Sequence, residues 1–451
     1  MARGRGVGAA WKIGAGLCLC ALGMGRAEAA DGLTFGATMR ARIEVIDGQI
    51  RPGFRSDDTA YNLRTTLKAE YRDGPIRVLG ELWDSRVYGN DRRSAIGSTE
   101  VNTIEPVQAF VEADLGDVLG KGTRLKVTAG RMMLNLGSRR LVAADDYRNT
   151  TAGYTGLRAD IGVGKDLQAT LIYMLPQMRR PDDIASVVGN RQAFDKESFD
   201  LVLWGGVATR TNLFGRAAGE VSFFHLGESD MPGRPTRDRS LDTAMLRLMQ
   251  KSKGGAGDFD VEGGYQWGSI SVSAAPTARR LDVLAWFVHA EAGYTLPGGW
   301  KPRAAFIFDV ASGDRRGGYY GRFDTIFGFR RGEYSPAGML STISRSNILS
   351  PGVRIDAVPD KRSDLYASYR PMWLHSRSDA FSTSNVIDPA GRSGRFAGHQ
   401  FDGRGRYWIV PDHLQFEVDA TFIAAGRFLR EAPNARGRDA FYLSLNLLAI
   451  L

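Results

Sequence analysis

A strict two-residue alternation of apolar and polar side chains is the feature that most constrains how this chain folds. Odd positions from Phe35 to Val45 are apolar, and the same alternation returns from Tyr61 to Tyr71. The polar faces carry basic residues, namely Arg40, Arg42, Arg64 and Lys68. Side chains alternate across a β-strand, and about 9 to 11 residues of tilted strand cross a bilayer. Strands with one apolar and one charged face therefore predict a transmembrane β-barrel with a wet interior.

The first thirty residues have the pattern of a secretory signal. Basic residues precede an apolar run that ends in small residues: Arg3, Arg5 and Lys12, then 13–24, then Ala27, Ala29 and Ala30. We expect residues 1–30 to be cleaved as a signal peptide and residues 31–451 to form one barrel domain. Both cysteines, Cys18 and Cys20, lie in this segment, so we expect a mature chain without thiols, disulfides or thiolate metal sites.

Hydropathy and charge exclude two classes of protein. No later segment reaches about 18 consecutive apolar residues, which excludes a helical membrane protein. The formal net charge of +9 is carried mainly by arginine. A basic chain can bind nucleic acid, but a secretory signal directs this one out of the cytoplasm, so no nucleic-acid partner is expected. Arginine suits a surface or channel that meets carboxylates, because its guanidinium stays charged and presents a planar fork of donors.

Period-two patterning and turn residues predict an all-β protein of about eighteen antiparallel strands. The candidate strands are 35–45, 61–71, 76–84, 106–114, 124–132, 154–161, 166–174, 199–206, 218–226, 242–249, 258–267, 283–294, 302–311, 349–356, 364–373, 400–410, 413–424 and 440–449. Single-chain bacterial barrels use an even number of strands, joined alternately by short turns and long loops. A barrel of this size leaves an aqueous channel and no unpaired backbone edge. A secreted β-sandwich or β-helix also alternates, but it does not explain strand faces that carry several charges.

Charged residues on the polar strand faces have two interpretations. The basic set comprises Arg40, Arg42, Arg64, Lys68, Lys126, Arg158, Arg404 and Arg406, and carboxylates such as Glu44, Glu70, Asp160 and Glu417 share the same side. Opposite charges on neighbouring strands can simply brace the wall. Alternatively, excess positive charge inside a low-dielectric wall enriches anions in the lumen.

Catalytic or metal sites are weakly indicated. The paired aspartates at 57–58, 145–146 and 182–183 fall in turn-rich segments, where aspartate is favoured for its backbone hydrogen bonds. The five histidines are His225, His289, His375, His399 and His413. Neither G-x-S-x-G nor H-E-x-x-H occurs, so we expect no enzyme, no cofactor and no metal, although distant residues can still meet in space.

One stretch resembles a known family of outer-membrane porins. Residues 130–142 read Gly-Arg-Met-Met-Leu-Asn-Leu-Gly-Ser-Arg-Arg-Leu-Val, followed by Arg-Asn-Thr at 148–150 and Gly-Leu-Arg at 156–158. This progression, with Ala-Ser-Gly-Asp at 311–314 and the segment 425–431, is similar to the alginate export family of Gram-negative bacteria. The resemblance implies an eighteen-stranded outer-membrane barrel with an arginine-lined, anion-selective pore.

The resemblance also implies roles for five arginines. Arg131, Arg140 and Arg158 match the motif arginines, which implies that they line the pore or brace the motif. Arg404 and Arg406 alternate with glycines and are similar to basic lumen residues of a late family strand.

We therefore expect a passive outer-membrane channel for an anionic, alginate-like polysaccharide or for small carboxylated solutes. The expected partners are outer-membrane lipid, the barrel-assembly machinery and, if polymer is exported, periplasmic secretion proteins. Two alternatives stay open: a barrel enzyme of the lipase or protease type, and a sealed barrel used for adhesion or assembly.

Overall fold

The computed structural model describes residues 32–145, 147–315, 317–329, 333–336 and 338–451, and the expected signal peptide lies outside these ranges. The strands are β1 (Leu33–Asp47), β2 (Asp58–Asp73), β3 (Ile76–Tyr88), β4 (Asn102–Gly116), β5 (Thr123–Met133), β6 (Gly153–Val163), β7 (Leu167–Pro176), β8 (Leu201–Phe214), β9 (Ala217–Glu228), β10 (Ser240–Gln250), β11 (Ala256–Ser271), β12 (Arg280–Thr295), β13 (Arg303–Ala311), β14 (Tyr319–Tyr320), β15 (Ile348–Ala357), β16 (Ser363–Trp373), β17 (Phe396–Val410), β18 (Leu414–Ala425) and β19 (Ala440–Ile450). Two short helices, α1 (Ile184–Val188) and α2 (Arg427–Glu431), lie in loops.

The sheet closes on itself. Each long strand pairs antiparallel with its neighbours, and β1 pairs with β19 from Thr38 opposite Ile450 to Asp47 opposite Phe441. The two-residue β14 pairs parallel with β12 and stands outside this ring, because β13 pairs directly with β15. The prediction of an eighteen-stranded antiparallel barrel is confirmed.

The two faces of the wall divide as the alternation predicted. On β1, Phe35 is 60% exposed on the outside, whereas Arg42 and Glu44 are buried inside. Aromatic side chains also face outward near strand ends, including Tyr61, Tyr71, Tyr265, Trp286, Tyr294 and Tyr407. Among the described residues, no helix is long and apolar enough to cross a membrane.

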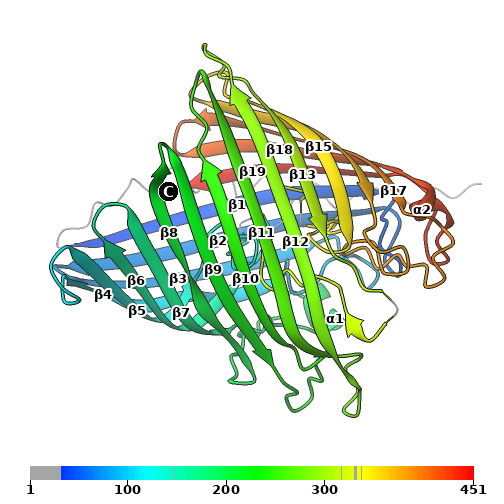
Figure 1. Cartoon of the computed structure of the whole chain (residues 1–451), viewed down its shortest axis with the longest axis horizontal. Helices are drawn as coiled ribbons and strands as arrows, with labels where there is room; N and C mark the ends of the chain where they lie inside the picture. The colour runs from blue at the N-terminus through cyan, green and yellow to red at the C-terminus, as the bar shows by residue number, and fades with distance from the viewer. Residues whose placement is uncertain (1–31, 146, 316, 330–332, 337) are drawn as a thin grey trace, which may run out of the picture.

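The two ends of the barrel differ in their connections. Figure 1 shows the loops with α1 and α2 gathered toward one end and the C-terminus at the other. Short turns join strands at the C-terminal end, for example 74–75 between β2 and β3 and 164–166 between β6 and β7. The long connections include 134–152, 177–200, 312–347 and 374–395. This asymmetry agrees with the turns and loops expected from composition.

Two of the long loops fold into the barrel. Loop 134–152 contacts the inward-facing Arg42 on β1, and loop 312–347 contacts the inward-facing Glu44 through the amide of Met339. Their apolar side chains belong to the buried core, including Leu134, Leu141, Tyr147, Phe323, Leu340 and Ile343. The half of the lumen nearest the long loops is therefore partly filled, because a wall of eighteen strands is too wide for its own side chains to fill.

Candidate functional site

One end of loop 134–152 is attached to β1 and β2 by arginines. Arg42 Nη1 donates to the Tyr147 carbonyl oxygen at 2.5 Å, and Arg42 Nε pairs with Glu44 at 3.0 Å. Arg40 and Arg64 both donate to the Arg148 carbonyl oxygen, at 2.7 and 3.2 Å. The three basic residues of β1 and β2 thus hold the loop backbone against the wall.

Asn149 locks the same end of the loop. Its side-chain nitrogen donates to the carbonyl oxygens of Leu63, Arg86 and Glu100, at 3.0 to 3.2 Å. The Thr150 hydroxyl donates to a further backbone carbonyl at 2.8 Å. The two hydrogens of this amide are shared among three backbone oxygens, which fixes the orientation of the side chain. The Asn-Thr pair noted in the sequence is therefore the anchor of this loop.

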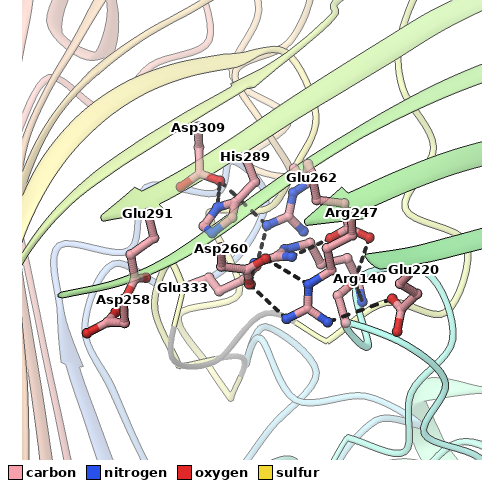
Figure 2. A network of polar contacts seen from close by, with 12 residues as sticks. Arg140, Glu220, Arg247, Asp258, Asp260, Glu262, His289, Glu291, Asp309 and Glu333 are labelled. Atoms are coloured by element: carbon pink, nitrogen blue, oxygen red, sulfur yellow. Dashed lines mark hydrogen bonds and ion pairs between the residues drawn. The ribbon is translucent and has the colours of Figure 1, made fainter. Parts of the chain in front are cut away.

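The other end of the loop is attached across the lumen to β11. Arg140 pairs with Glu262, with Asp260 at 3.2 Å and with Glu333 of loop 312–347 at 2.7 Å, and its side chain is only 4% exposed. Figure 2 shows Arg140 among these carboxylates. Loop 134–152 consequently runs from β1 and β2 to β11, and Arg140 also joins it to the second inward loop.

The Arg140 contacts continue into a larger network of charges on β9 to β16 (Figure 2). Arg247 binds Asp260 at 2.7 Å. The Asp309 carboxylate lies 2.8 Å from His289 Nδ1 and 2.6 Å from Arg370 Nη1. Burial alone would raise the pKa of Glu333, but Arg140 and Arg345 hold it well below its usual value. Glu333 therefore stays ionised and keeps the two loops joined.

Two histidines contact carboxylates, and His399 Nδ1 lies 2.9 Å from the Tyr369 hydroxyl. His289 Nδ1 bonds Asp309, while its buried Nε2 has no partner within the described ranges. His225 bonds Asp242 at 2.8 Å and stacks on Trp204, which is exposed on the outer face. In the described part of the chain, no three His, Cys, Asp or Glu residues gather as metal ligands.

The half of the lumen nearest the short turns carries charges that water reaches. Lys68 is 44% exposed beside Glu70, and Arg158 is 30% exposed with Nε at 2.8 Å from Asp160. Arg404 and Arg406, the latter 35% exposed, share Asp364 at 2.7 and 2.9 Å. The structure thus separates the predicted set: Arg40, Arg42, Arg64 and Arg140 hold loops, and Lys68, Arg158, Arg404 and Arg406 face open lumen.

Arg131 has a different position. The strand register places it opposite Thr155. Thr155 lies two residues from the outward-facing Leu157 and therefore on the same face of β6. It pairs with Glu105 and Glu197, both at 2.5 Å. Arg131 therefore joins β4 and β5 to loop 177–200 and lies on the side of the sheet away from Arg158.

Comparison with known proteins identifies the family. A family model described as alginate export matches residues 31–443. The chain belongs to the alginate export family. This membership and the closed barrel place it in the outer membrane of a Gram-negative bacterium. No curated protein matches the sequence.

Several solved porins share the fold of this alginate export family member. Pseudomonas aeruginosa OccK9 (OpdG) is 12% identical, with a TM-score of 0.59 over 93% of this chain and 98% of that one. P. aeruginosa OccK2 (OpdF), solved in complex with glucuronate, is 13% identical, with a TM-score of 0.53 over 92% and 96%. P. aeruginosa OpdK, solved with vanillate, is 12% identical, with a TM-score of 0.55 over 92% and 98%. At this identity the likeness concerns the fold alone.

The structure of the alginate export family member adds lumen residues that sequence analysis missed. Arg77, Arg247, Arg303 and Arg354 also face the lumen, in rows with Glu112, Glu220, Asp356 and Ser368. The alternation rule covers these positions and could have found them.

Charge is also distributed unexpectedly: the strands hold more acidic than basic residues, whereas the long loops together hold more basic than acidic residues. The positive excess therefore comes from the loops, including the two inside the barrel, rather than from the wall.

Proposed function

We propose that this protein is a passive outer-membrane channel for an anionic polysaccharide or for small carboxylated solutes. The observation that carries the proposal is the set of water-accessible cations in the open half of the lumen, Lys68, Arg158, Arg404 and Arg406. Two porins of the same fold were solved with glucuronate and with vanillate, which both carry a carboxylate. Membership of the alginate export family favours a uronate polymer among the possible solutes.

These cations are arranged to bind carboxylates weakly and repeatedly. Each is partly neutralised by a wall carboxylate, as Arg158 is by Asp160 and Arg406 by Asp364. A partly neutralised guanidinium still offers donors to a passing carboxylate. Conduction requires sites that attract a solute but also release it. A row of moderate sites meets that requirement better than one strong site.

We propose a bracing role for the remaining predicted arginines. Arg40, Arg42 and Arg64 hold loop 134–152 at one wall, and Arg140 holds it at the other. Arg131 holds loop 177–200 through Glu197. Arg40, Arg42, Arg64 and Arg140 set the position of loop 134–152, and through that loop the width of the passage.

Ion selectivity tests the proposal directly. We expect planar-bilayer recordings of the purified protein in a KCl gradient to give a reversal potential that favours Cl⁻ over K⁺. Glucuronate or an oligouronate added to one side is expected to reduce the chloride current by occupying the lumen. A reversal potential that favours K⁺ would refute an anion channel.

Two other functions are distinguishable by the same preparation. A barrel enzyme would hydrolyse a lipid or peptide substrate, and would lose that activity when His225 or His289 is replaced. A sealed barrel, which the packed inward loops favour, would pass negligible single-channel current even after loop 312–347 is shortened. We propose neither enzymatic activity nor a cofactor.

We also propose that residues 1–30 are removed when the protein is exported. N-terminal sequencing of the mature protein would test this cleavage.

A further inference from the structure

Tyr366 lies between two arginines of the lumen wall. It belongs to β16, and its ring centre is 4.0 Å from the guanidinium carbon of Arg354 on β15 and 5.1 Å from that of Arg404 on β17. Because β15 and β17 are the two neighbours of β16, the arginines approach the ring from opposite sides. The tyrosine is only 4% exposed, so the two guanidiniums cover it.

The outer edge of each guanidinium is held by a carboxylate. Arg354 forms bonds of 2.7 to 3.0 Å with both oxygens of Asp356. Arg404 donates to Asp364 at 2.7 Å, and Arg406 binds the same carboxylate. Each guanidinium plane is thus set by an aromatic ring on one side and a carboxylate on the other.

The tyrosine ring is itself held in place. Its hydroxyl donates to Asp402 Oδ2 at 2.9 Å, and the other oxygen of Asp402 accepts a bond of 2.6 Å from the Thr421 hydroxyl. Asp402 lies on β17, two residues from Arg404. The ring therefore cannot turn away from the arginines without breaking a buried hydrogen bond to the same strand that carries Arg404.

An aromatic ring and a carboxylate have different effects on a bound guanidinium. A carboxylate orients the cation and cancels most of its charge, whereas a ring orients it through its quadrupole and leaves the charge intact. Two arginines left alone at this spacing would repel one another and move toward the carboxylates. With the ring between them the two guanidiniums stay on neighbouring strands, each also bound to its own carboxylate and still 17% and 19% exposed.

We propose that Tyr366 is a specificity-determining residue of this channel, which positions Arg354 and Arg404 as a paired docking point for the carboxylates of a passing anion. The inference rests on the proposed anion transport and names a residue for it. A solute with several carboxylates can engage both arginines, whereas a solute with one carboxylate engages either of them. The pair therefore favours oligomeric over monomeric uronates.

The test compares Tyr366→Leu with Tyr366→Phe in planar bilayers, with glucuronate and an oligouronate as blockers of the chloride current. Loss of two cation–π contacts predicts that Tyr366→Leu weakens oligouronate block by between about five- and thirtyfold, with a smaller effect on glucuronate. Tyr366→Phe keeps the ring and is expected to retain most of the oligouronate block. Unchanged block in Tyr366→Leu, or an equal loss in Tyr366→Phe, would overturn the proposal.

Controls separate this inference from folding and from the proposed function. Tyr265→Leu removes an exposed tyrosine from the outer face and is expected to leave block unchanged. If Tyr366→Leu does not fold, Tyr366→Trp supplies a ring of another size and is expected to retain oligouronate block; loss of that block in folded Tyr366→Trp would overturn the proposal. If the unaltered channel prefers K⁺, the proposed function fails, but the change in oligouronate block between Tyr366 variants still decides the role of the ring.

Discussion

Arg40 and Arg64 face each other directly across β1 and β2, and both guanidiniums donate to one backbone oxygen, that of Arg148. Like charges directly opposite on neighbouring strands normally destabilise a sheet. Here a loop carbonyl serves as their shared acceptor, so the wall and loop 134–152 stabilise one another. We therefore expect the position of loop 134–152 to be sensitive to substitutions at its few attachment points, and ion selectivity to be sensitive to substitutions in the open lumen.

Replacing Arg404 and Arg406 together with serine is expected to shift the reversal potential toward cations. Both arginines face open lumen and share one carboxylate, so their loss leaves Asp364 uncompensated. Bilayer recordings in a KCl gradient measure the shift. Arg86→Ser is the matched control, because the Arg86 side chain pairs with Asp84 and lies opposite Leu63, on the outward-facing side of the wall. An unchanged reversal potential in the double variant would mean that these arginines only brace the wall.

Replacing Arg140 with glutamine is expected to loosen both inward loops. The change leaves Glu262 and Asp260 without this buried partner, and breaking a buried ion pair on one side costs about 3–5 kcal/mol. Urea unfolding followed by tryptophan fluorescence measures the loss, and single-channel traces are expected to become noisier. Arg124→Gln, which breaks an exposed pair with Asp114, is expected to leave the urea midpoint nearly unchanged. Equal midpoints for the two variants would contradict a bracing role for Arg140.

Replacing Asn149 with alanine is expected to free one end of loop 134–152. Three backbone carbonyls lose their shared donor, and each buried acceptor left unsatisfied costs about 1–3 kcal/mol. Limited proteolysis is expected to cut the loop in the variant and to spare it in the unaltered protein. Asn434→Ala removes a single exposed bond to the Asn385 carbonyl and serves as the control. Protection of the loop in Asn149→Ala would show that the arginines alone hold it.

Stability is expected to fall as pH rises through 6 because of Asp195. Burial raises the pKa of Asp195 to about 6, against about 3.9 in an unfolded chain. Folding therefore favours the protonated form: the contribution is fully present below about pH 4 and is lost as pH rises through about 6. Two pKa units correspond to about 3 kcal/mol. Thermal unfolding in detergent at pH 4 and pH 7.5 measures the difference.

Asp195→Asn is expected to be less sensitive to pH over the same range, because an amide does not ionise. Asp182→Asn, in the same loop and half exposed, is the control and is expected to behave like the unaltered protein. A pH profile of Asp195→Asn identical to that of the unaltered protein would show that other groups set the dependence.

Local patterning accounts for most of the fold. The alternation from Phe35 to Val45 predicted a strand that the structure extends to Leu33–Asp47, and all eighteen predicted strands occur. Alternation is a property of each strand alone, so it is readable without knowing the neighbours. Closure follows, since a membrane leaves no water to satisfy an open sheet edge.

The site was predicted less completely, because its residues differ in partners rather than in pattern. Arg140 and Arg158 look alike in the sequence, yet Arg140 is buried among three carboxylates and Arg158 faces water beside one. Tyr366 carries no signal of its own, since its two arginine partners lie on separate neighbouring strands.

The order of residues along the chain was enough to determine a barrel, its strand number and which face of each strand carries charge, because these depend on a period of two and on short turns. Only the tertiary structure decided which arginines brace loops and which meet the lumen. That choice depends on where loops 134–152 and 312–347 cross the interior, and contacts between distant segments leave no periodic trace in the sequence.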